Sequence, residues 1–403
     1  MQVGRETPKR AAKSLMALAP WLVLGLIFFL AFSRGWVSTW HSIAVPASTP
    51  AFMDLRGFPS GRQVARQGGD PLIANSLDPE KRPLNYPHLL AHLLWTLGIT
   101  DKNIPLFGVS FAALYLCCVS WLIYASKTVR EMCLLLIAGL SVAPLFAIEQ
   151  GNTDLLIFSL LFFAFLLREN FAGPLLFFVA ILLKIYPVAA FAVDTARRPK
   201  KRRHLSAAPL VAAIAIFAWR WREVDAIRHA TPATFLNSYG ILSLQKLIRF
   251  WAVDSGWSFH KAAIGGWIVA GACWAAALAI AAFVWLKSPG YEKELLQSKP
   301  GLLFATFSGI YVFCFLAGSN FDYRLIYLIP TLPFAMELTR RPHASRLGFL
   351  YIVFVLLVEN LVVIEFSPLL IVAQLAALTV FFMALPILVA QCKEFLRNAG
   401  STA

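Results

Sequence analysis

Charged residues are scarce in this chain of 403 residues. Asp, Glu, Lys and Arg together make up 14% of it, whereas hydrophobic residues make up 59%. A soluble domain carries about 25% charged residues, so this scarcity excludes an ordinary soluble fold. Cysteine is also sparse: no pair among the six cysteines has the loop spacing of a disulfide or a zinc site. We interpret the cysteines as packing residues.

Internal repeats are not evident either, although many transporters are built from them. What the sequence has instead is a series of apolar runs, most of them close to the ~20 residues that cross a bilayer as a helix. The clearest runs are 14–32, 106–125, 132–148, 262–286, 302–316 and 369–390. The strands of a membrane β-barrel are only ~10 residues long and alternate apolar with polar residues, unlike these runs. The sequence therefore predicts an all-α polytopic membrane protein of about 10–12 transmembrane helices.

Positive charge exceeds negative charge by 15. In a soluble protein this would suggest nucleic acid, but Lys and Arg here fall in short loops, as the positive-inside rule describes. We therefore interpret the positive residues as markers of the cytoplasmic loops and expect no nucleic-acid partner. This interpretation places both termini on the cytoplasmic side of the inner (plasma) membrane. The N-terminus is interpreted as an uncleaved first span, because no small-residue cleavage site follows its apolar run.

The alternation of loops predicts a single domain over 1–403 with two large extracytoplasmic loops, 33–103 and 219–261. A single crossing by 171–194 would place the basic loop "RRPKKRR" outside. Pro187, in "KIYP", cannot continue the helical hydrogen-bond ladder. We therefore predict a broken or re-entrant helix pair over 171–194 with Lys184 near its tip. The alternative is that the turn at 149–154 lies within the membrane and the count is wrong elsewhere.

Polar side chains gather in segments predicted to lie on the outer side of the membrane. The stretch "EQGNTD", residues 149–154, interrupts an apolar sequence, and charges at bilayer depth usually face a cavity or a partner. The other clusters are "MDLRGF" with Asp54, "GDPLIANSLDPEKRPLNYPHLL" and "GSNFDYR". Structural interpretations stay open: Glu149 or Asp154 could pair with a cation, and Lys184 could snorkel.

Carboxylates, cations and amides on an outer membrane surface suit sugar transfer from a lipid-phosphate donor. A carboxylate can take the proton of an acceptor hydroxyl. Lys and Arg can stabilise the leaving phosphate, and amides suit sugar hydroxyls. Gaps between spans would accommodate a polyprenyl tail.

Four segments in order, "MDLRGF", "GDPLIANSLDPEKRPLNYPHLL", "EQGNTDLL" and "LLKIYP", resemble the integral-membrane glycosyltransferases of family 87. These belong to the C-type superfamily and include polyprenyl-phosphate-mannose-dependent mannosyltransferases. The match is incomplete: "GDPL" replaces "G-x-PY", "NYPHL" lacks the second proline of "YPP", and "EQGN" inverts the order of "GQ-N". The pattern spans 50–250, and the C-terminal third agrees in hydropathy and in "DYRLIYLIPTLP".

The resemblance implies a C-type bundle that transfers a mannose-like hexose or a pentose, with inversion, at the extracytoplasmic face. The donor would be a polyprenyl-phosphate sugar and the acceptor an envelope lipid or glycan. By the same resemblance Asp54 is the general base, Gln150 and Asn152 line the sugar or acceptor pocket, and Lys184 faces the donor phosphate. The full set of expected substrate-binding residues is Arg56, Tyr86, Glu149, Gln150, Asn152, Asp154, Lys184, Asn320, Asp322 and Arg324.

Other functions remain open at this point. A transporter or flippase of a lipid-linked sugar would use the same buried charges, and a non-catalytic subunit of envelope assembly would need no base. The long outer loop with Asp54 favours the enzyme. No cofactor is expected, and metal dependence stays open because Asp54, Glu149 and Asp322 could converge on a cation.

Overall fold

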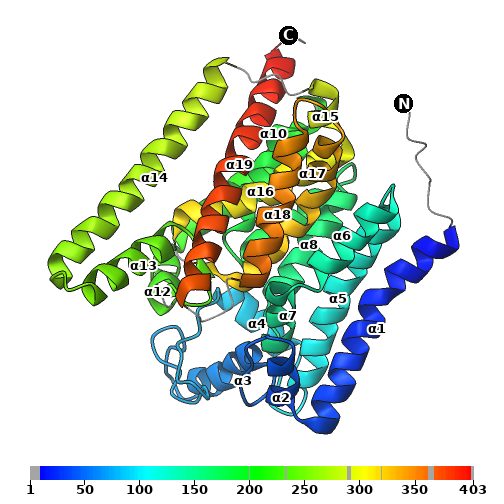
Figure 1. Cartoon of the computed structure of the whole chain (residues 1–403). Coiled ribbons are helices and arrows are strands. Elements are labelled where there is room, and N and C mark those ends of the chain that lie inside the picture. Colours follow the sequence, from blue (N-terminus) through cyan, green and yellow to red (C-terminus); the bar gives the residue numbers. More distant parts are fainter. Residues whose placement is uncertain are drawn as a thin grey trace. The chain divides into compact units, whose positions relative to one another are not determined.

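The computed structural model describes residues 10–198, 200–231, 234–287, 292–318, 320–361 and 367–400. This part of the chain is almost wholly helical, with two short strands (Figure 1). Five helices are long and apolar enough to cross a membrane, and two bent helix pairs raise the number to as many as seven. The prediction of an all-α, multi-pass membrane protein is confirmed.

All six of the clearest apolar runs lie in helices. The five long ones are α1 (Arg10–Arg34), α5 (Ile104–Ala125), α14 (Phe259–Lys287), α16 (Lys299–Ala317) and α19 (Ser367–Gly400). The sixth run is the bent pair α6 (Val129–Gly139) and α7 (Val142–Gln150), which meet at 43°. The described helices give five to seven candidate spans, so the finer count of 10–12 spans and the side of each terminus stay predictions.

Two of the long helices expose rows of large apolar side chains. Leu22 and Phe29 on α1 and Trp267 and Leu278 on α14 are all largely exposed. Soluble monomers rarely expose apolar patches of this extent. Contact with lipid would remove the cost of exposing these side chains to water. These faces therefore support a bilayer environment.

The chain packs as two compact units. Unit 1 holds 1–188 and 205–232, and unit 2 holds 189–204 and 233–403. Besides α1 and α5–α7, unit 1 contains α2 (Trp36–Ser42), α3 (Met53–Arg66), α4 (His88–Thr96), α8 (Asp154–Leu166), α9 (Ala172–Leu183) and α12 (Trp221–Ala230). Helices α10 (Pro187–Ala196) and α11 (Lys200–Trp219) cross the division.

Unit 2 is built from packed helices and one short ladder. Besides α14, α16 and α19, it contains β1 (Ser238–Tyr239), α13 (Ile241–Asp254), α15 (Lys293–Gln297), β2 (Asn320–Phe321), the 3-10 helix η1 (Asp322–Thr331), α17 (Leu332–Thr339) and α18 (Ser345–Leu361). The strands are antiparallel, with Ser238 opposite Phe321 and Tyr239 opposite Asn320.

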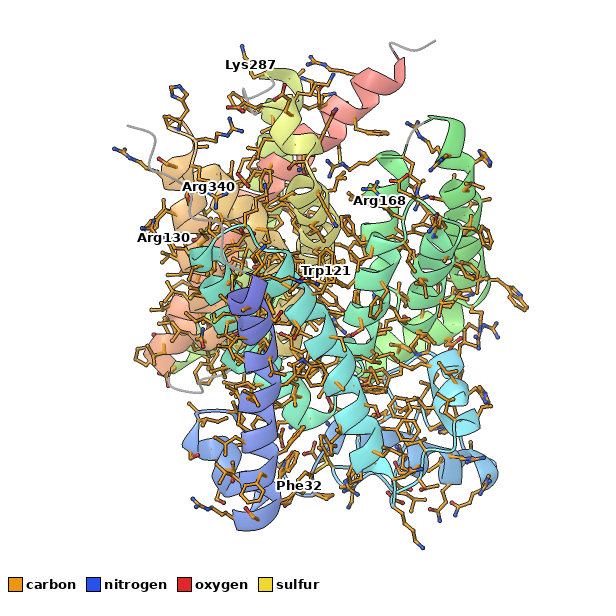
Figure 2. The ribbon with its side chains drawn as sticks, turned by 90° about the vertical axis from the view of Figure 1, so that its right-hand side faces the viewer. Phe32, Trp121, Arg130, Arg168, Lys287 and Arg340 are labelled. Atoms are coloured by element: carbon orange, nitrogen blue, oxygen red, sulfur yellow. The ribbon has the colours of Figure 1, made fainter. Side chains whose placement is uncertain are left out.

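The predicted loop 33–103 is a folded layer at one end of unit 1, made of α2, α3 and α4 and their connections (Figure 1). Figure 2 shows Phe32 at the end of α1 that leads into this layer, whereas Arg130 and Arg168 lie toward the opposite end of the unit. Basic residues at the end away from the loop fit the predicted orientation, in which this layer is extracytoplasmic.

The break predicted near Lys184 is present. Helix α9 ends at Leu183, Lys184 has an extended backbone, and α10 begins at Pro187. Backbone groups at the break keep hydrogen bonds: the Lys184 amide donates to the Ala180 carbonyl, and the Val188 amide donates to the Ile185 carbonyl. Irregular backbone at membrane depth is tolerated where protein surrounds it.

Phe52 joins the outer layer to the helices beneath it. It is fully buried, and its backbone adopts a left-handed conformation just before α3 begins. Its ring packs 4.8 Å from that of Trp36 on α2. A Cβ built on Gly108 of α5 would lie 2.5 Å from the ring, and one on Gly151 would lie 3.0 Å from the Phe52 Cβ. Two glycines therefore make room for one aromatic side chain.

This packing predicts that Gly108→Ala destabilises the protein, although alanine favours a helix. The added methyl would overlap the Phe52 ring, and overpacking a filled core costs about 1–3 kcal/mol. We expect a lower thermal unfolding midpoint in detergent. Gly25→Ala on α1 is the matched control, since nothing lies within 4 Å of its new methyl. Equal midpoints for the two variants would contradict this account.

Candidate functional site

Asp54 lies in the first turn of α3, with a mostly buried side chain. Its Oδ2 accepts a hydrogen bond of 2.5 Å from the Asn152 Nδ2, and its Oδ1 accepts one of 3.1 Å from the Arg82 Nη1. Each carboxylate oxygen has two lone pairs. Both oxygens of Asp54 can therefore accept one further proton donor. We call Asp54, Arg82 and Asn152 the Asp54 cluster.

Asn152 holds the turn between α7 and α8 against α3. Its Oδ1 accepts the Asp154 backbone amide at 2.8 Å, while its Nδ2 donates to Asp54. Gly151 has φ +63°, a value that glycine adopts without strain. This turn brings "EQGNTD" against the segment 33–103.

Asp154 and Lys184 form a buried ion pair next to this turn. The Lys184 Nζ lies 2.6 Å from the Asp154 Oδ1, and the Tyr186 hydroxyl donates to the same oxygen. Asp154 also lies in the first turn of α8, where the helix dipole favours a negative charge. Asp154 is thus paired with a cation, which is the structural alternative that the sequence left open.

Tyr86 connects the ion pair with the Asp54 cluster. Its ring lies 4.9 Å from the Lys184 Nζ and stacks on Phe58 at 5.1 Å. Burial raises the pKa of the Tyr86 phenol well above its usual range, and the carboxylates of Asp54 and Asp154 raise it further. The phenol stays protonated and can donate a hydrogen bond.

Glu149 and Gln150 tie α7 to the outer layer. The Glu149 Oε1 accepts from the Trp36 Nε1 at 2.8 Å and from the Ser48 amide at 3.2 Å. The Gln150 Nε2 donates to the Glu149 Oε2 at 2.6 Å and to the Ser48 Oγ at 3.3 Å. These contacts give both residues a structural role, and their part in substrate binding stays a prediction.

Arg82 is the functional candidate that the sequence analysis missed. It lies 3.1 Å from Asp54, 3.1 Å from Glu80 and 3.5 Å from Asp78. Burial lowers the pKa of Arg82, but these three carboxylates outweigh burial and raise it. Its segment, "LDPEKRPLNYP", enters the family resemblance through its Tyr and Pro residues. The charge pattern of the segment does not indicate which cation reaches Asp54.

Arg56 lies apart from the Asp54 cluster in its contacts. Its Nε donates to the Ala51 carbonyl at 3.2 Å, and its Nη1 lies 4.0 Å from Asp101. Burial lowers the pKa of Arg56, and Asp101 partly offsets this. No contact of Arg56 with Asp54 is found in the described chain.

No family model, no curated protein and no solved structure matches this chain. The assignment of a function therefore rests on the geometry of the site.

Asn320, Asp322 and Arg324 lie in unit 2, where β2 leads into η1. Asn320 donates to the Cys314 carbonyl and accepts from Arg324. Asp322 is fully buried, and neither of its carboxylate oxygens has a hydrogen-bond partner among the described residues. The printed partner of Arg324 is therefore Asn320, not Asp322. The part of Asn320, Asp322 and Arg324 in substrate binding stays a prediction.

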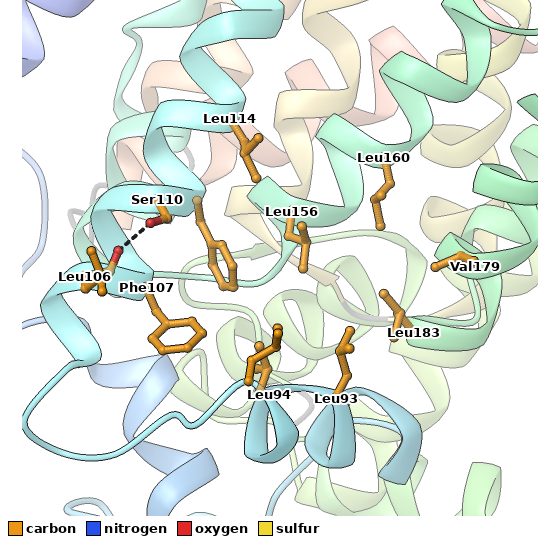
Figure 3. A pocket seen from close by; sticks show the side chains of 12 residues that line it. Leu93, Leu94, Leu106, Phe107, Ser110, Leu114, Leu156, Leu160, Val179 and Leu183 are labelled. Carbon is orange, nitrogen blue, oxygen red and sulfur yellow. Dashed lines mark hydrogen bonds between the residues drawn. The ribbon is translucent and has the colours of Figure 1, made fainter. Parts of the chain in front are cut away.

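An apolar pocket of about 470 Å³ lies between α4, α5, α8 and α9 (Figure 3). We call it the leucine pocket. Its lining is Leu93, Leu94, Leu97, Leu106, Phe107, Ser110, Phe111, Leu114, Leu156, Leu160, Val179 and Leu183. The Ser110 hydroxyl is not free, because it donates to the Leu106 carbonyl at 2.7 Å. One lining residue, Leu183, directly precedes Lys184 in the sequence.

Metal ligands do not cluster in the described residues: no group of three or more His, Cys, Asp or Glu side chains could hold an ion. Metal dependence therefore has no geometric support within this part of the chain.

The ion pair predicts a non-additive pair of substitutions. Lys184→Met would leave the Asp154 carboxylate buried without its cation, and breaking such a pair costs about 3–5 kcal/mol. Lys184→Met with Asp154→Asn removes both charges, so we expect the double variant to be more stable than Lys184→Met alone. Thermal unfolding in detergent measures this, with the exposed Lys102→Met as control. A double variant less stable than Lys184→Met would show that the pair is not coupled.

Proposed function

We propose that this chain is a membrane glycosyltransferase of the C-type kind that uses a polyprenyl-phosphate sugar as donor. The observation that carries the proposal is the Asp54 cluster: a carboxylate held by a guanidinium and an amide, in a folded layer above an apolar pocket. The combination of base, cation and lipid-sized apolar space suits transfer from a lipid phosphate.

Asp54 is the proposed general base. The acceptor hydroxyl gives its proton to an Asp54 carboxylate oxygen while its own oxygen attacks the anomeric carbon of the donor sugar. The bond between that carbon and the phosphate oxygen breaks on the opposite face, and polyprenyl phosphate leaves with the electron pair. The product therefore has the inverted anomeric configuration. General-base catalysis by a positioned carboxylate contributes about 10²–10⁴-fold to the rate.

Arg82 is the cation best placed to receive the leaving phosphate. Its side chain is about one-third exposed (36%), and it already contacts Asp54, so it lies at the reacting groups. Arginine binds phosphate oxygens through two parallel N–H groups. Lys184 is committed to Asp154 at 2.6 Å, so we assign it first to positioning the turn that carries Asn152.

The leucine pocket is the proposed site for the first isoprene units of the donor. Its lining carries no charged residue, and Leu156 and Leu183 place it within two residues of Asp154 and Lys184 along the chain. Its volume of about 470 Å³ lies within the range of roughly 300–1,000 Å³ that small-molecule sites occupy. A lipid tail in this pocket would place its phosphate near the polar end of α8.

The direct test is Asp54→Asn. The amide keeps the size of the side chain and can still bond to a neighbour, but it cannot accept the acceptor proton. We expect the transfer rate to fall by about 10²–10⁴-fold with the purified chain and polyprenyl-phosphate-mannose or a polyprenyl-phosphate pentose. The matched control is Asp101→Asn, which makes the same change at an exposed carboxylate of the same layer.

Three results would overturn the proposal. Transfer by Asp54→Asn at the wild-type rate would show that Asp54 is not the base. A product with retained configuration would exclude the single displacement. Movement of the lipid-linked sugar across vesicles with no donor consumed would identify a transporter or flippase instead.

A further inference from the structure

A second concave site lies between the C-terminal half of α3 and helix α4. It has a volume of about 360 Å³ and is lined by Arg62, Ala65, Arg66, His92, Trp95 and Thr96. We call it the basic hollow. Arg62 is eight residues after Asp54 on α3, about 12 Å along a helix that rises 1.5 Å per residue. The basic hollow is therefore separate from the Asp54 cluster.

The two arginines of the basic hollow have no acidic partner. Neither the Arg62 nor the Arg66 side chain forms an ion pair or hydrogen bond with any other described residue. Arg82 and Arg56, in the same layer, both face carboxylates. Like charges four residues apart repel each other on a helix. An anion bound between the two guanidinium groups would remove this repulsion.

The floor of the basic hollow is rigid. The Trp95 indole is buried, and its Nε1 donates to the Phe58 carbonyl at 2.7 Å. The His92 ring meets it edge-on at 4.9 Å. The aromatic floor is held in place before any ligand binds, so only the two arginine side chains have to be ordered on binding.

Helix α4 connects the basic hollow with an apolar surface. His92, Trp95 and Thr96 line the hollow on one side of α4. Leu93, Leu94 and Leu97, interleaved with them in sequence, line the leucine pocket on another side (Figure 3). A ligand with a phosphate group and a hydrocarbon chain would meet both surfaces across one short helix. A soluble anion would use only the first.

We propose that the basic hollow binds the phosphate headgroup of an anionic membrane lipid. Arg62 and Arg66 hold the phosphate oxygens, His92 borders them, and a chain of the lipid crosses α4 onto its leucines. The inference does not rest on the proposed glycosyl transfer, because no residue of the Asp54 cluster takes part. The chain of this lipid would share Leu93 and Leu94 with the proposed donor site, so the two lipids would compete for the leucine pocket.

The experiment is titration of the full chain in neutral detergent with short-chain phosphatidylglycerol, monitored by calorimetry. A hydrogen bond to a charged group contributes about 1.5–3 kcal/mol, or roughly tenfold or more in affinity. We expect the double variant Arg62→Gln with Arg66→Gln to bind at least about tenfold more weakly. The matched control, Arg34→Gln with Lys102→Gln, removes the same net charge from the same layer outside the hollow and should bind as the wild type does.

A second variant tests the cavity without changing its charge. Thr96 is exposed at the end of α4, so Thr96→Trp fills the hollow with little risk to the fold. We expect it to weaken binding as the arginine variant does. Wild-type affinity in both variants, or an equal loss in the charge control, would overturn the proposal.

Glycerol phosphate separates a lipid from a soluble anion. The proposal predicts that this headgroup without chains binds at least about tenfold more weakly than the lipid. If it binds equally well, the ligand is a soluble phosphate and the lipid assignment is wrong.

Discussion

The hydrogen bond from Asn152 to Asp54 is the contact on which the site depends. It joins a turn between two membrane helices to a helix of the outer layer, 98 residues apart in sequence. Asn152 can reach Asp54 because Gly151 adopts a left-handed conformation and leaves room for the buried Phe52 ring. The carboxylate is therefore positioned by backbone geometry and aromatic packing as much as by its polar partners.

Two cations of unit 1 are paired with carboxylates: Lys184, which is buried, and Arg82, which is about one-third exposed. Removing a charge from water is expensive unless an opposite charge and hydrogen bonds compensate for it. Lys184 meets this cost through Asp154, and Arg82 through Asp54 and its neighbours. The arginines of the basic hollow differ because they have no acidic partner in the described chain and lie beside open space. That contrast distinguishes charges that hold the fold together from charges available to a ligand.

Much of the candidate site could be predicted from the sequence, because polar residues inside apolar runs are conspicuous. Asp54, Tyr86, Asn152, Asp154 and Lys184 do come together in unit 1. Arg82 could not be predicted, because its segment offers two adjacent cations, Lys81 and Arg82, and only the folded loop decides which one reaches Asp54. The hydrogen bond from Trp36 to Glu149 could not be predicted either, because no sequence pattern links two residues that lie 113 positions apart.

The sequence by itself determined that the chain is helical and membrane-embedded, and it placed the helix break at Lys184. Those properties follow from local hydropathy and from proline, which act over a few residues. Tertiary structure alone decided the partners: Lys184 binds Asp154, Arg82 binds Asp54, and Asn320 takes Arg324. The physical reason is that a charge or amide can pair with any complementary group within reach, and reach is a property of the folded chain.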